Sequence, residues 1–270
     1  MTDKTEKTNN EYVYIMSFDI GIRNQACHID RYKISELNQL KSENVASYKR
    51  YNTNREATEE FSIFLKKMFK KGERVFTDKI DLAEKDDKKI NNRFIVTNKI
   101  LVKLTNYLED LNEKKIFDNV NYFLIEQQLK KNNIAQQLSY HLRAYLIMLF
   151  LNFKPIIMFP SKYKTLILGA PKYIEKNITK NKENKQNIQI VDHSQNKNGN
   201  KKIKLGTKRK KWASELAYKI LLERNDSQGV EDLFVNKKYG KPDDCSDVLL
   251  MCISFCYMVF IDDKKSILNC

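Results

Sequence analysis

The sequence predicts an α/β protein in which a mixed five-stranded sheet is flanked by helices and interrupted by insertions. Short runs rich in β-branched and aromatic residues, such as 12–18 and 120–125, have strand length and polar boundaries. Longer segments with apolar residues three and four positions apart lie between the later runs, as in strand–helix–strand units. The chain has 270 residues, 41% of them hydrophobic, so it can bury a sizeable core.

The first half of the chain predicts an antiparallel meander followed by helices. Three strands joined by short connections are expected at 12–18, 25–34 and 44–51. Gly21 permits a tight turn after the first of them. Two amphipathic helices are expected at 56–71 and 98–114. The charged, poorly patterned stretch at about 73–93 is interpreted as a loop or an insertion.

The second half predicts a strand–helix–strand unit and two closing helices. A strand at 120–125, a helix at about 133–153 and a strand at 155–159 imply parallel pairing through a right-handed crossover. The segment at about 175–206 is dominated by Asn, Lys and Gln, and such a composition cannot offset chain entropy by burial, so a disordered basic insertion is expected. The closing helices are expected at about 210–224 and 244–261, and residues 1–11 are interpreted as a disordered tail.

The charge of the chain indicates a polyanionic partner. The formal net charge is +15 at pH 7, an excess that favours binding to nucleic acid. Residues 172–211 contain 13 Lys or Arg against 3 Asp or Glu, which is two thirds of that excess. The basic insertion has two interpretations: added phosphate contacts, which would make binding salt-dependent, or compositional drift in a solvated loop. We interpret the detailed sequence of the insertion as compositional drift and its positive charge as a means of attracting DNA.

The cysteines and apolar segments limit where the chain acts. Five cysteines without a CxxC pair, and no secretory pattern, indicate a reducing intracellular setting. Cys245, Cys252 and Cys256 share one helical stripe, which is more typical of a packed face than of a zinc site. The apolar run at 248–261 has 14 residues, too few to cross a bilayer and suited to a central core helix. We therefore expect no membrane partner.

Three short strings place carboxylates at the ends of apolar elements. Asp19 and Glu126 each close a predicted strand, and Asp243, Asp244 and Asp247 open the last predicted helix. Helical spacing puts Asp247 on the same face as the two earlier acids. Carboxylates at the ends of buried elements cost desolvation energy unless a cation or a donor compensates them, and Mg²⁺ prefers oxygen ligands. Each string alone also suits helix capping or solubility, but their joint occurrence favours a metal site.

Other motifs for catalysis are absent or incomplete. The sequence has neither G-x-x-x-x-G-K nor G-x-G-x-x-G, which argues against an ATPase or a dehydrogenase. The S-x-x-K spacing at 161–164 lacks the partner motifs of serine β-lactamases. His28, His141 and His193 lie on unrelated elements, which argues against a catalytic triad.

The acidic strings extend into longer patterns, F-D-I-G-I-R-N at 18–24, L-I-E-Q-Q at 124–128 and K-P-D-D-C-S-D at 241–247. These patterns resemble the RuvC-type Holliday junction resolvases, especially their poxviral and fungal mitochondrial branch. That branch typically shows I-D-x-G-x-K-N, I-E-x-Q and K-K-D-D-x-x-D-(A/S). The resemblance covers roughly 13–260 without the insertions. It implies a ribonuclease H-like fold, with one nuclease domain at 12–262.

The resemblance also implies roles for the acids. Asp19, Glu126, Asp244 and Asp247 would be catalytic and would bind two Mg²⁺ ions per active site, with Mn²⁺ as a substitute. Asp243 is the alternative to Asp244. The family's Lys-Asn after the first glycine is Arg-Asn at 23–24 here, which keeps the charge, and the small residue after the final acid is Val248.

A basic residue near the scissile phosphate is a further implication. Lys210 and Lys211 are the first candidates by position, with Lys162 and Lys164 as outsiders; the alternative is a basic helix face that contacts only solvent. The full set of expected DNA-binding residues is Arg23, Lys162, Lys208, Arg209, Lys210 and Lys211.

The expected function is that of a hydrolase, a Mg²⁺-dependent, structure-selective endodeoxyribonuclease that cuts opposing strands of four-way DNA junctions in recombination or in processing of replication intermediates. Two coordinated cuts suit a twofold homodimer. One alternative is a less selective nuclease for flaps or other branched DNA, and another is a nucleic-acid-binding protein without cleavage. The Asn-, Lys- and Ile-rich composition suits a virus-encoded protein acting in the host cell cytoplasm.

Overall fold

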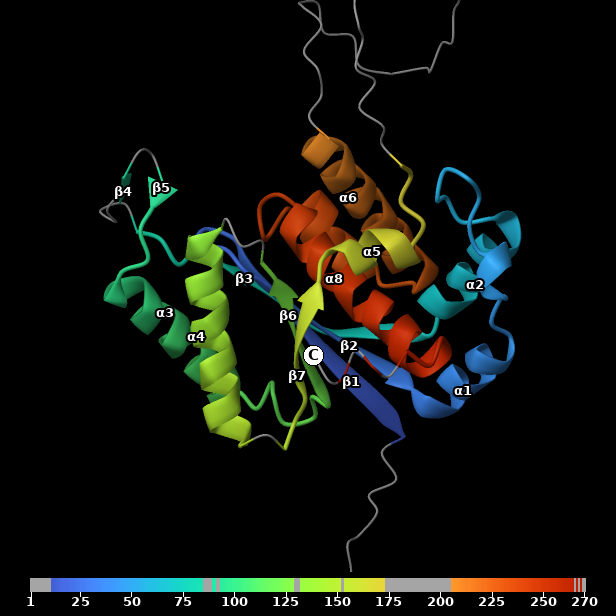
Figure 1. The fold of residues 1–270 in the computed structure, drawn as a ribbon. Helices are drawn as coiled ribbons and strands as arrows, with labels where there is room; N and C mark the ends of the chain where they lie inside the picture. The colour runs from blue at the N-terminus through green and yellow to red at the C-terminus, as the bar shows by residue number, and fades with distance from the viewer. Residues whose placement is uncertain are drawn as a thin grey trace, which may run out of the picture.

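The computed structural model describes residues 11–84, 89–90, 93–128, 132–151, 153–172, 205–264, 266 and 268. The predicted tail, up to residue 10, and nearly all of the predicted basic insertion lie outside this part of the chain. A mixed five-stranded sheet forms the centre, with the strand order β3-β2-β1-β6-β7 (Figure 1). Its strands are β1 (Tyr12–Asp19), β2 (Gln25–Lys33), β3 (Gly72–Ile80), β6 (Tyr122–Gln127) and β7 (Ile156–Pro160).

The strand pairing confirms the predicted mixed sheet. β1 pairs antiparallel with β2 and parallel with β6, while β7 pairs parallel with β6. β1 is the central strand, and its residues from Ile15 to Phe18 are all buried. Burial on both faces explains why β1 is almost continuously apolar and does not alternate between apolar and polar residues.

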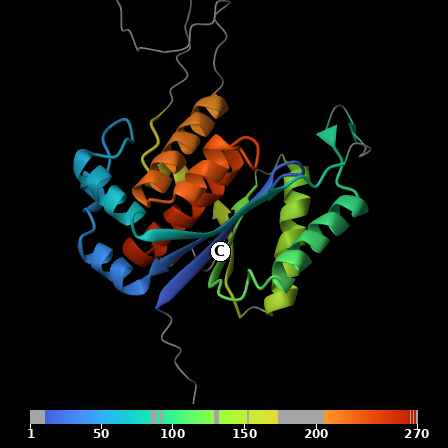
Figure 2. The ribbon, with the colours of Figure 1, turned by 180° about the vertical axis from the view of Figure 1, so that it is seen from behind.

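Helices cover both faces of the sheet (Figures 1 and 2). One core packs under α3 (Asn98–Glu113) and α4 (Asn133–Phe150). The other contains residues of five helices, α1 (Ile34–Ser42), α2 (Glu59–Phe69), α5 (Lys162–Ile167), α6 (Leu205–Glu223) and α8 (Asp243–Cys256). The smaller elements are β4 (Lys89–Ile90), β5 (Arg93–Phe94), α7 (Ser227–Val230) and the helical turns η1 (Ser47–Lys49), η2 (Glu231–Val235) and η3 (Tyr257–Ile261).

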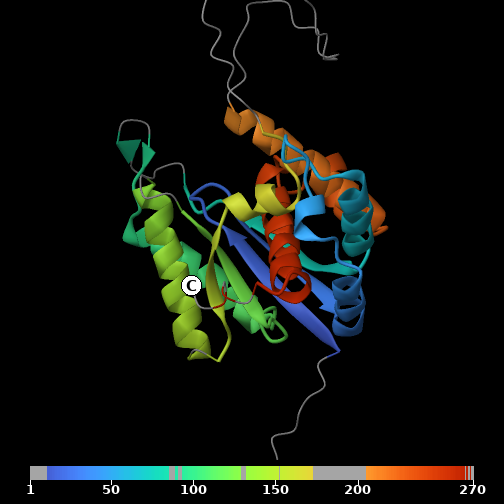
Figure 3. The same cartoon turned by 45° about the vertical axis from the view of Figure 1, so that its right-hand side comes forward.

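The last helix is a central core element, as the sequence predicted. α8 and η3 form one continuous helical stretch of 19 residues that passes the length and composition test for a membrane span, but 89% of its apolar window is buried inside the protein. It lies across β1 and β2 (Figure 3). Ser17 of β1 donates a hydrogen bond to the Val248 carbonyl at 2.7 Å, and Cys252 contacts Ser17 at 3.2 Å. The cysteine stripe is therefore a packed face.

The prediction for the third strand is wrong. Residues 44–51 contain the turn η1, and α1 precedes them. The third strand is instead β3, inside the stretch that was interpreted as a loop. β3 lies at the sheet edge, and its charges pair with neighbours, as in the contact between Arg31 and Glu73 at 2.5 Å. An edge strand with cross-strand ion pairs lacks the apolar run by which the other strands were found.

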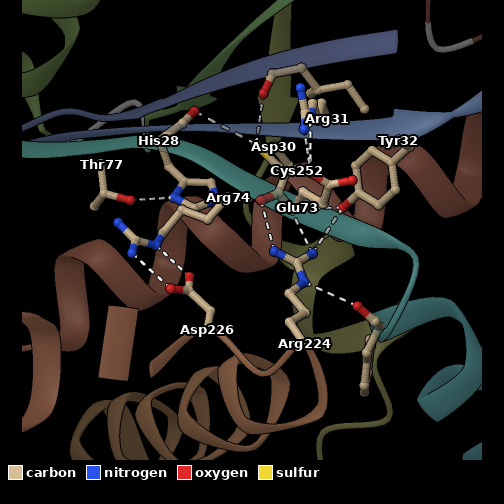
Figure 4. Close-up of polar contacts among 12 residues, drawn as sticks. His28, Asp30, Arg31, Tyr32, Glu73, Arg74, Thr77, Arg224, Asp226 and Cys252 are labelled. Atoms are coloured by element: carbon tan, nitrogen blue, oxygen red, sulfur yellow. Dashed lines mark hydrogen bonds and ion pairs between the residues drawn. The ribbon is translucent and has the colours of Figure 1, made fainter. Parts of the chain in front are cut away.

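A buried polar network joins α6 to β2 and β3 (Figure 4). The Asp30 carboxylate accepts hydrogen bonds from His28 at 2.7 Å, from the Tyr32 hydroxyl at 2.8 Å and from both terminal nitrogens of Arg224 at 2.8 Å. Burial alone would raise the pKa of Asp30, but Arg224 and His28 outweigh it and hold that pKa well below its usual range. A Cβ at residue 72 would overlap the Arg224 guanidinium, so a side chain there would have to displace Arg224 from its place beside Asp30.

Candidate active site

The strand register brings the first two acids together. Phe18 of β1 pairs with Ile125 of the parallel strand β6, so Asp19 and Glu126 follow on neighbouring strands at the same end of the sheet. The first turns of α8 supply Asp244 and Asp247. All four side chains line one cavity of about 550 Å³, which we call the carboxylate cavity. The acids that the sequence singled out therefore line the same cavity, although they are spread over more than 200 residues of the chain.

Lys164 of α5 lies among these acids. Its Nζ is 2.9 Å from Glu126 Oε1 and 3.0 Å from Asp247 Oδ1. The Lys164 side chain is only 6% exposed, because α5 packs directly against α8 beyond the end of β7 (Figures 1 and 3). A buried ammonium needs such counter-charges, and it reduces the repulsion between the carboxylates.

The protonation of the acids reflects their crowding. Burial raises the pKa of Asp19 well above its ordinary value, and the neighbouring Glu126 raises it further. Burial also raises the pKa of Asp247, which Lys164 only partly offsets. For Glu126, burial acts in the same direction, but Lys164 and the hydrogen bond with Asp19 outweigh it and lower the pKa. Asp19 and Asp247 therefore retain a proton more readily than Glu126 does.

Two more lysines hold the acids at the start of α8. Lys79 Nζ of β3 is 2.7 Å from Asp244 Oδ2, and Lys210 Nζ of α6 is 2.6 Å from Asp243 Oδ2. Asp244 is buried and lines the carboxylate cavity, whereas Asp243 lines only a neighbouring cleft. This geometry favours Asp244 over Asp243 as the fourth acid of the cavity.

The donor set suits a hard divalent cation. Four carboxylates on one cavity are oxygen ligands of the kind that Mg²⁺ and Mn²⁺ take. Within the described residues, no three Asp, Glu, His or Cys side chains lie close enough together to hold an ion. Lys164 and Lys79 together pair with three of the four acids, so a cation at this cavity would take over charge that these two ammonium groups balance in part.

The predicted basic residues separate into two groups. Arg23 and Lys210 line the carboxylate cavity. The others are exposed and do not line it, namely Lys162, Lys208, Arg209 and Lys211. Sequence reasoning missed Lys79 and ranked Lys164 as an outsider. Only the tertiary structure brings these lysines to the acids, and no local pattern marked them.

Comparisons with known proteins do not place the chain in a family. No protein-family model matches the chain. The uncharacterised protein 170L of Invertebrate iridescent virus 6 is 31% identical over 140 residues, which is 52% of this chain and 52% of that protein. The chain thus matches about half the length of this curated relative.

Two solved structures resemble the fold at 10% sequence identity. The RuvC structure from Thermus thermophilus has a TM-score of 0.43, with 92% of this chain and 95% of that chain covered. The T. thermophilus RuvC in complex with a Holliday junction substrate has a TM-score of 0.37, with 92% and 94% covered. At these scores, the likeness decides nothing about the chemistry of this chain.

Proposed function

We propose that the protein is a Mg²⁺-dependent endodeoxyribonuclease that resolves four-way DNA junctions. The supporting observation is the convergence of Asp19, Glu126, Asp244 and Asp247 on one cavity that Lys164 partly neutralises. Burying so many acids together is costly for a fold unless a cation compensates them, so a structural role alone explains them poorly. The sequence motifs around these acids and the net charge of +15 point to the same polyanionic substrate.

The four carboxylates would hold the metal ions, and bound ions would supply an activated water and stabilise the leaving oxygen of the phosphodiester. The sheet would fix the positions of Asp19 and Glu126, because the residues just before them are paired between β1 and β6. Lys164 would act as a point charge beside the scissile phosphate, where a buried ammonium interacts more strongly than one in water. Arg23 and Lys210 at the cavity would contact the flanking backbone.

Substrate selectivity is the direct test of this proposal. Purified protein in Mg²⁺ should cut a labelled four-way junction faster than a flap or a plain duplex. Preference for the flap would favour the less selective branched-DNA nuclease, and binding without cutting of any substrate would favour the non-catalytic alternative. The junction should be cut on two opposing strands.

Asp19→Asn tests the catalytic assignment. This variant should retain junction binding and lose cleavage, because the amide cannot supply the anionic ligand. Asp110→Asn is the matched control, since Asp110 lies on α3, is exposed and pairs with Lys114. If Asp19→Asn cuts as fast as the control, the carboxylate cavity is not the active site.

We also propose a homodimer, because two opposed cuts require two active sites. An exposed apolar stripe on and just after α4 supports a second copy as the partner. Tyr140, Met148 and Leu151 are 60%, 76% and 70% exposed, and the small Ala144 between the first two would let an identical helix approach closely. Met148→Asp should shift the mass in sedimentation from dimer to monomer, whereas Ile63→Asp on α2 should not.

The origin of the protein and the compartment in which it acts can also be proposed. We infer a virus-encoded protein acting in the reducing interior of the host cell. The similarity to a protein of an iridescent virus and the four free, buried cysteines of the described residues support this setting. If this setting is correct, the protein should be recovered from infected cells together with junction-containing DNA. Recovery of the protein only from uninfected host organelles would contradict the setting.

A further inference from the structure

A basic cleft adjoins the carboxylate cavity. It has a volume of about 540 Å³ and shares Arg23, Asn24, Lys210 and Asp244 with that cavity. Its lining includes five cations, Arg23, Lys79, Lys210, Lys238 and Lys241, against three acids. We call this region the lysine cleft. Two of its acids, Asp243 and Asp244, already pair with lysines.

Lys79 lines the lysine cleft and contacts Asp244, which lines both cavities. Its side chain is 8% exposed, and its Nζ lies 2.7 Å from Asp244 Oδ2 and 3.3 Å from the Lys241 carbonyl oxygen. The pairing of β3 with β2 fixes the backbone of Lys79, which lies opposite Ala26 in the antiparallel register. One side of this ammonium therefore faces an acid of the carboxylate cavity, while the other faces a loop of the lysine cleft.

The loop at the far wall of the lysine cleft presents cations to the solvent. Lys238 and Lys241 are exposed on either side of Gly240, whose φ of +73° turns the chain. The Lys238 ammonium lies 5.1 Å from the centre of the Tyr239 ring, and the Tyr239 hydroxyl donates to the Thr77 carbonyl at 2.8 Å. The loop is thus fastened to β3, so its cations have a defined position relative to the acids.

We propose that the lysine cleft binds the phosphodiester next to the scissile one, and that Lys79 couples its occupancy to the metal site. In the structure, Lys79 pairs with Asp244. If Asp244 served as a ligand of a divalent cation, Lys79 would lose this acid partner, and a backbone phosphate in the cleft would replace it. This inference rests on the proposed function and adds a substrate contact that the motifs do not contain.

The coupling follows from charge. A buried ammonium without a counter-ion is costly, so metal binding at Asp244 is favoured when a phosphate is available to Lys79. Linkage requires the reverse as well: bound DNA must strengthen metal binding by the same factor. A lysine that only fastened β3 to α8 would give neither effect.

Metal binding without DNA is the first test. Mn²⁺ is titrated into the wild-type protein and into Lys79→Met, with bound Mn²⁺ measured by electron paramagnetic resonance. Removing the competing ammonium should tighten Mn²⁺ binding by about fivefold. Weaker or unchanged binding by a variant with an unaltered circular dichroism spectrum would overturn the proposal, because Lys79 would then be a structural contact.

DNA binding is the second test, by fluorescence anisotropy on a labelled junction in Ca²⁺ and in EDTA. Lys79→Met should weaken binding about fivefold in Ca²⁺ and hardly at all in EDTA. Lys241→Met should weaken binding in both conditions and lower the salt slope by about 1. Lys66→Met on α2, which lines neither cavity, removes the same charge and should change little.

Two further comparisons make the result decisive. Lys79→Arg should restore the metal-dependent part of DNA binding. Equal losses for Lys79→Met in Ca²⁺ and EDTA, or equal losses for Lys66→Met and Lys241→Met, would overturn the proposal. Failure of the nuclease assignment would give a different result from failure of this inference. In that case Asp19→Asn would bind Mn²⁺ and cleave DNA as the wild-type protein does.

Discussion

Replacing Lys164 by methionine should destabilise the metal-free protein and make it depend on divalent cations. The substitution keeps the side-chain length but removes a buried ammonium that is 2.9 and 3.0 Å from two half-buried carboxylates. Breaking a buried ion pair by removing one partner costs about 3 to 5 kcal/mol. Because the remaining acids can take up protons, we expect a loss near the lower limit, about 3 kcal/mol at pH 7.

Urea unfolding in EDTA and in Mg²⁺ measures this effect. An ion at a hundred times its Kd stabilises a folded protein by about 2.7 kcal/mol, and it should stabilise Lys164→Met more than wild type because no ammonium competes. The loss should shrink as pH falls and the carboxylates become neutral, since Lys164 lowers the pKa of Asp19, Glu126 and Asp247. Lys162→Met, on the exposed face of the same helix, should cost less than about 0.5 kcal/mol. A loss below about 1 kcal/mol for Lys164→Met, or equal Mg²⁺ stabilisation of both proteins, would refute the reasoning.

Three further predictions concern the core, the pH dependence and the basic insertion. Arg224→Met should lower the free energy of unfolding at pH 7 by about 3 to 5 kcal/mol, because it leaves the Asp30 carboxylate buried with fewer donors. The pKa of Asp30 is held low in the fold, so the stability from this pair is present above the ordinary value of 3.8 and lost as pH falls below it; urea unfolding between pH 3 and 7 should show the cost of the substitution shrinking toward the acid end, and a constant cost would contradict this. Mn²⁺ affinity should rise with pH, because Asp19 and Asp247 have raised pKa values and must lose protons to bind the ion; titrations that give one affinity at every pH would count against the site. Deleting residues 175–204 should weaken DNA binding and flatten its salt dependence while junction cleavage survives, and an unchanged salt slope would favour compositional drift.

The sequence predicted those parts of the fold whose signals are local. β1, β6 and β7 are apolar runs because they are buried on both faces or nearly so, and α3 and α4 carry regular apolar faces. β3 was missed because an edge strand pairs charges with its neighbours and leaves Val75 exposed. The four acids could be predicted because each ends or begins an apolar element, and such positions stand out in a sequence.

The lysines of the site could not be predicted in the same way. Lys164 and Lys79 are 2 of 49 Lys and Arg residues, and nothing near them in the sequence differs from exposed lysines elsewhere. Their burial depends on the packing of α5 against α8 and on the pairing of β3 with β2. A residue whose role comes only from distant contacts becomes visible only once those contacts are known.

The wide separation of the acids along the chain has a consequence during synthesis. One acid emerges from the ribosome early, one near the middle, and two only with α8. A nascent chain that has already folded its first strands still lacks two of the four acids of the carboxylate cavity. Under the proposed function, such a chain cannot cut DNA before α8 docks across β1. Proteolytic fragments that end before residue 244 would lack the same two acids and would be inactive for the same reason.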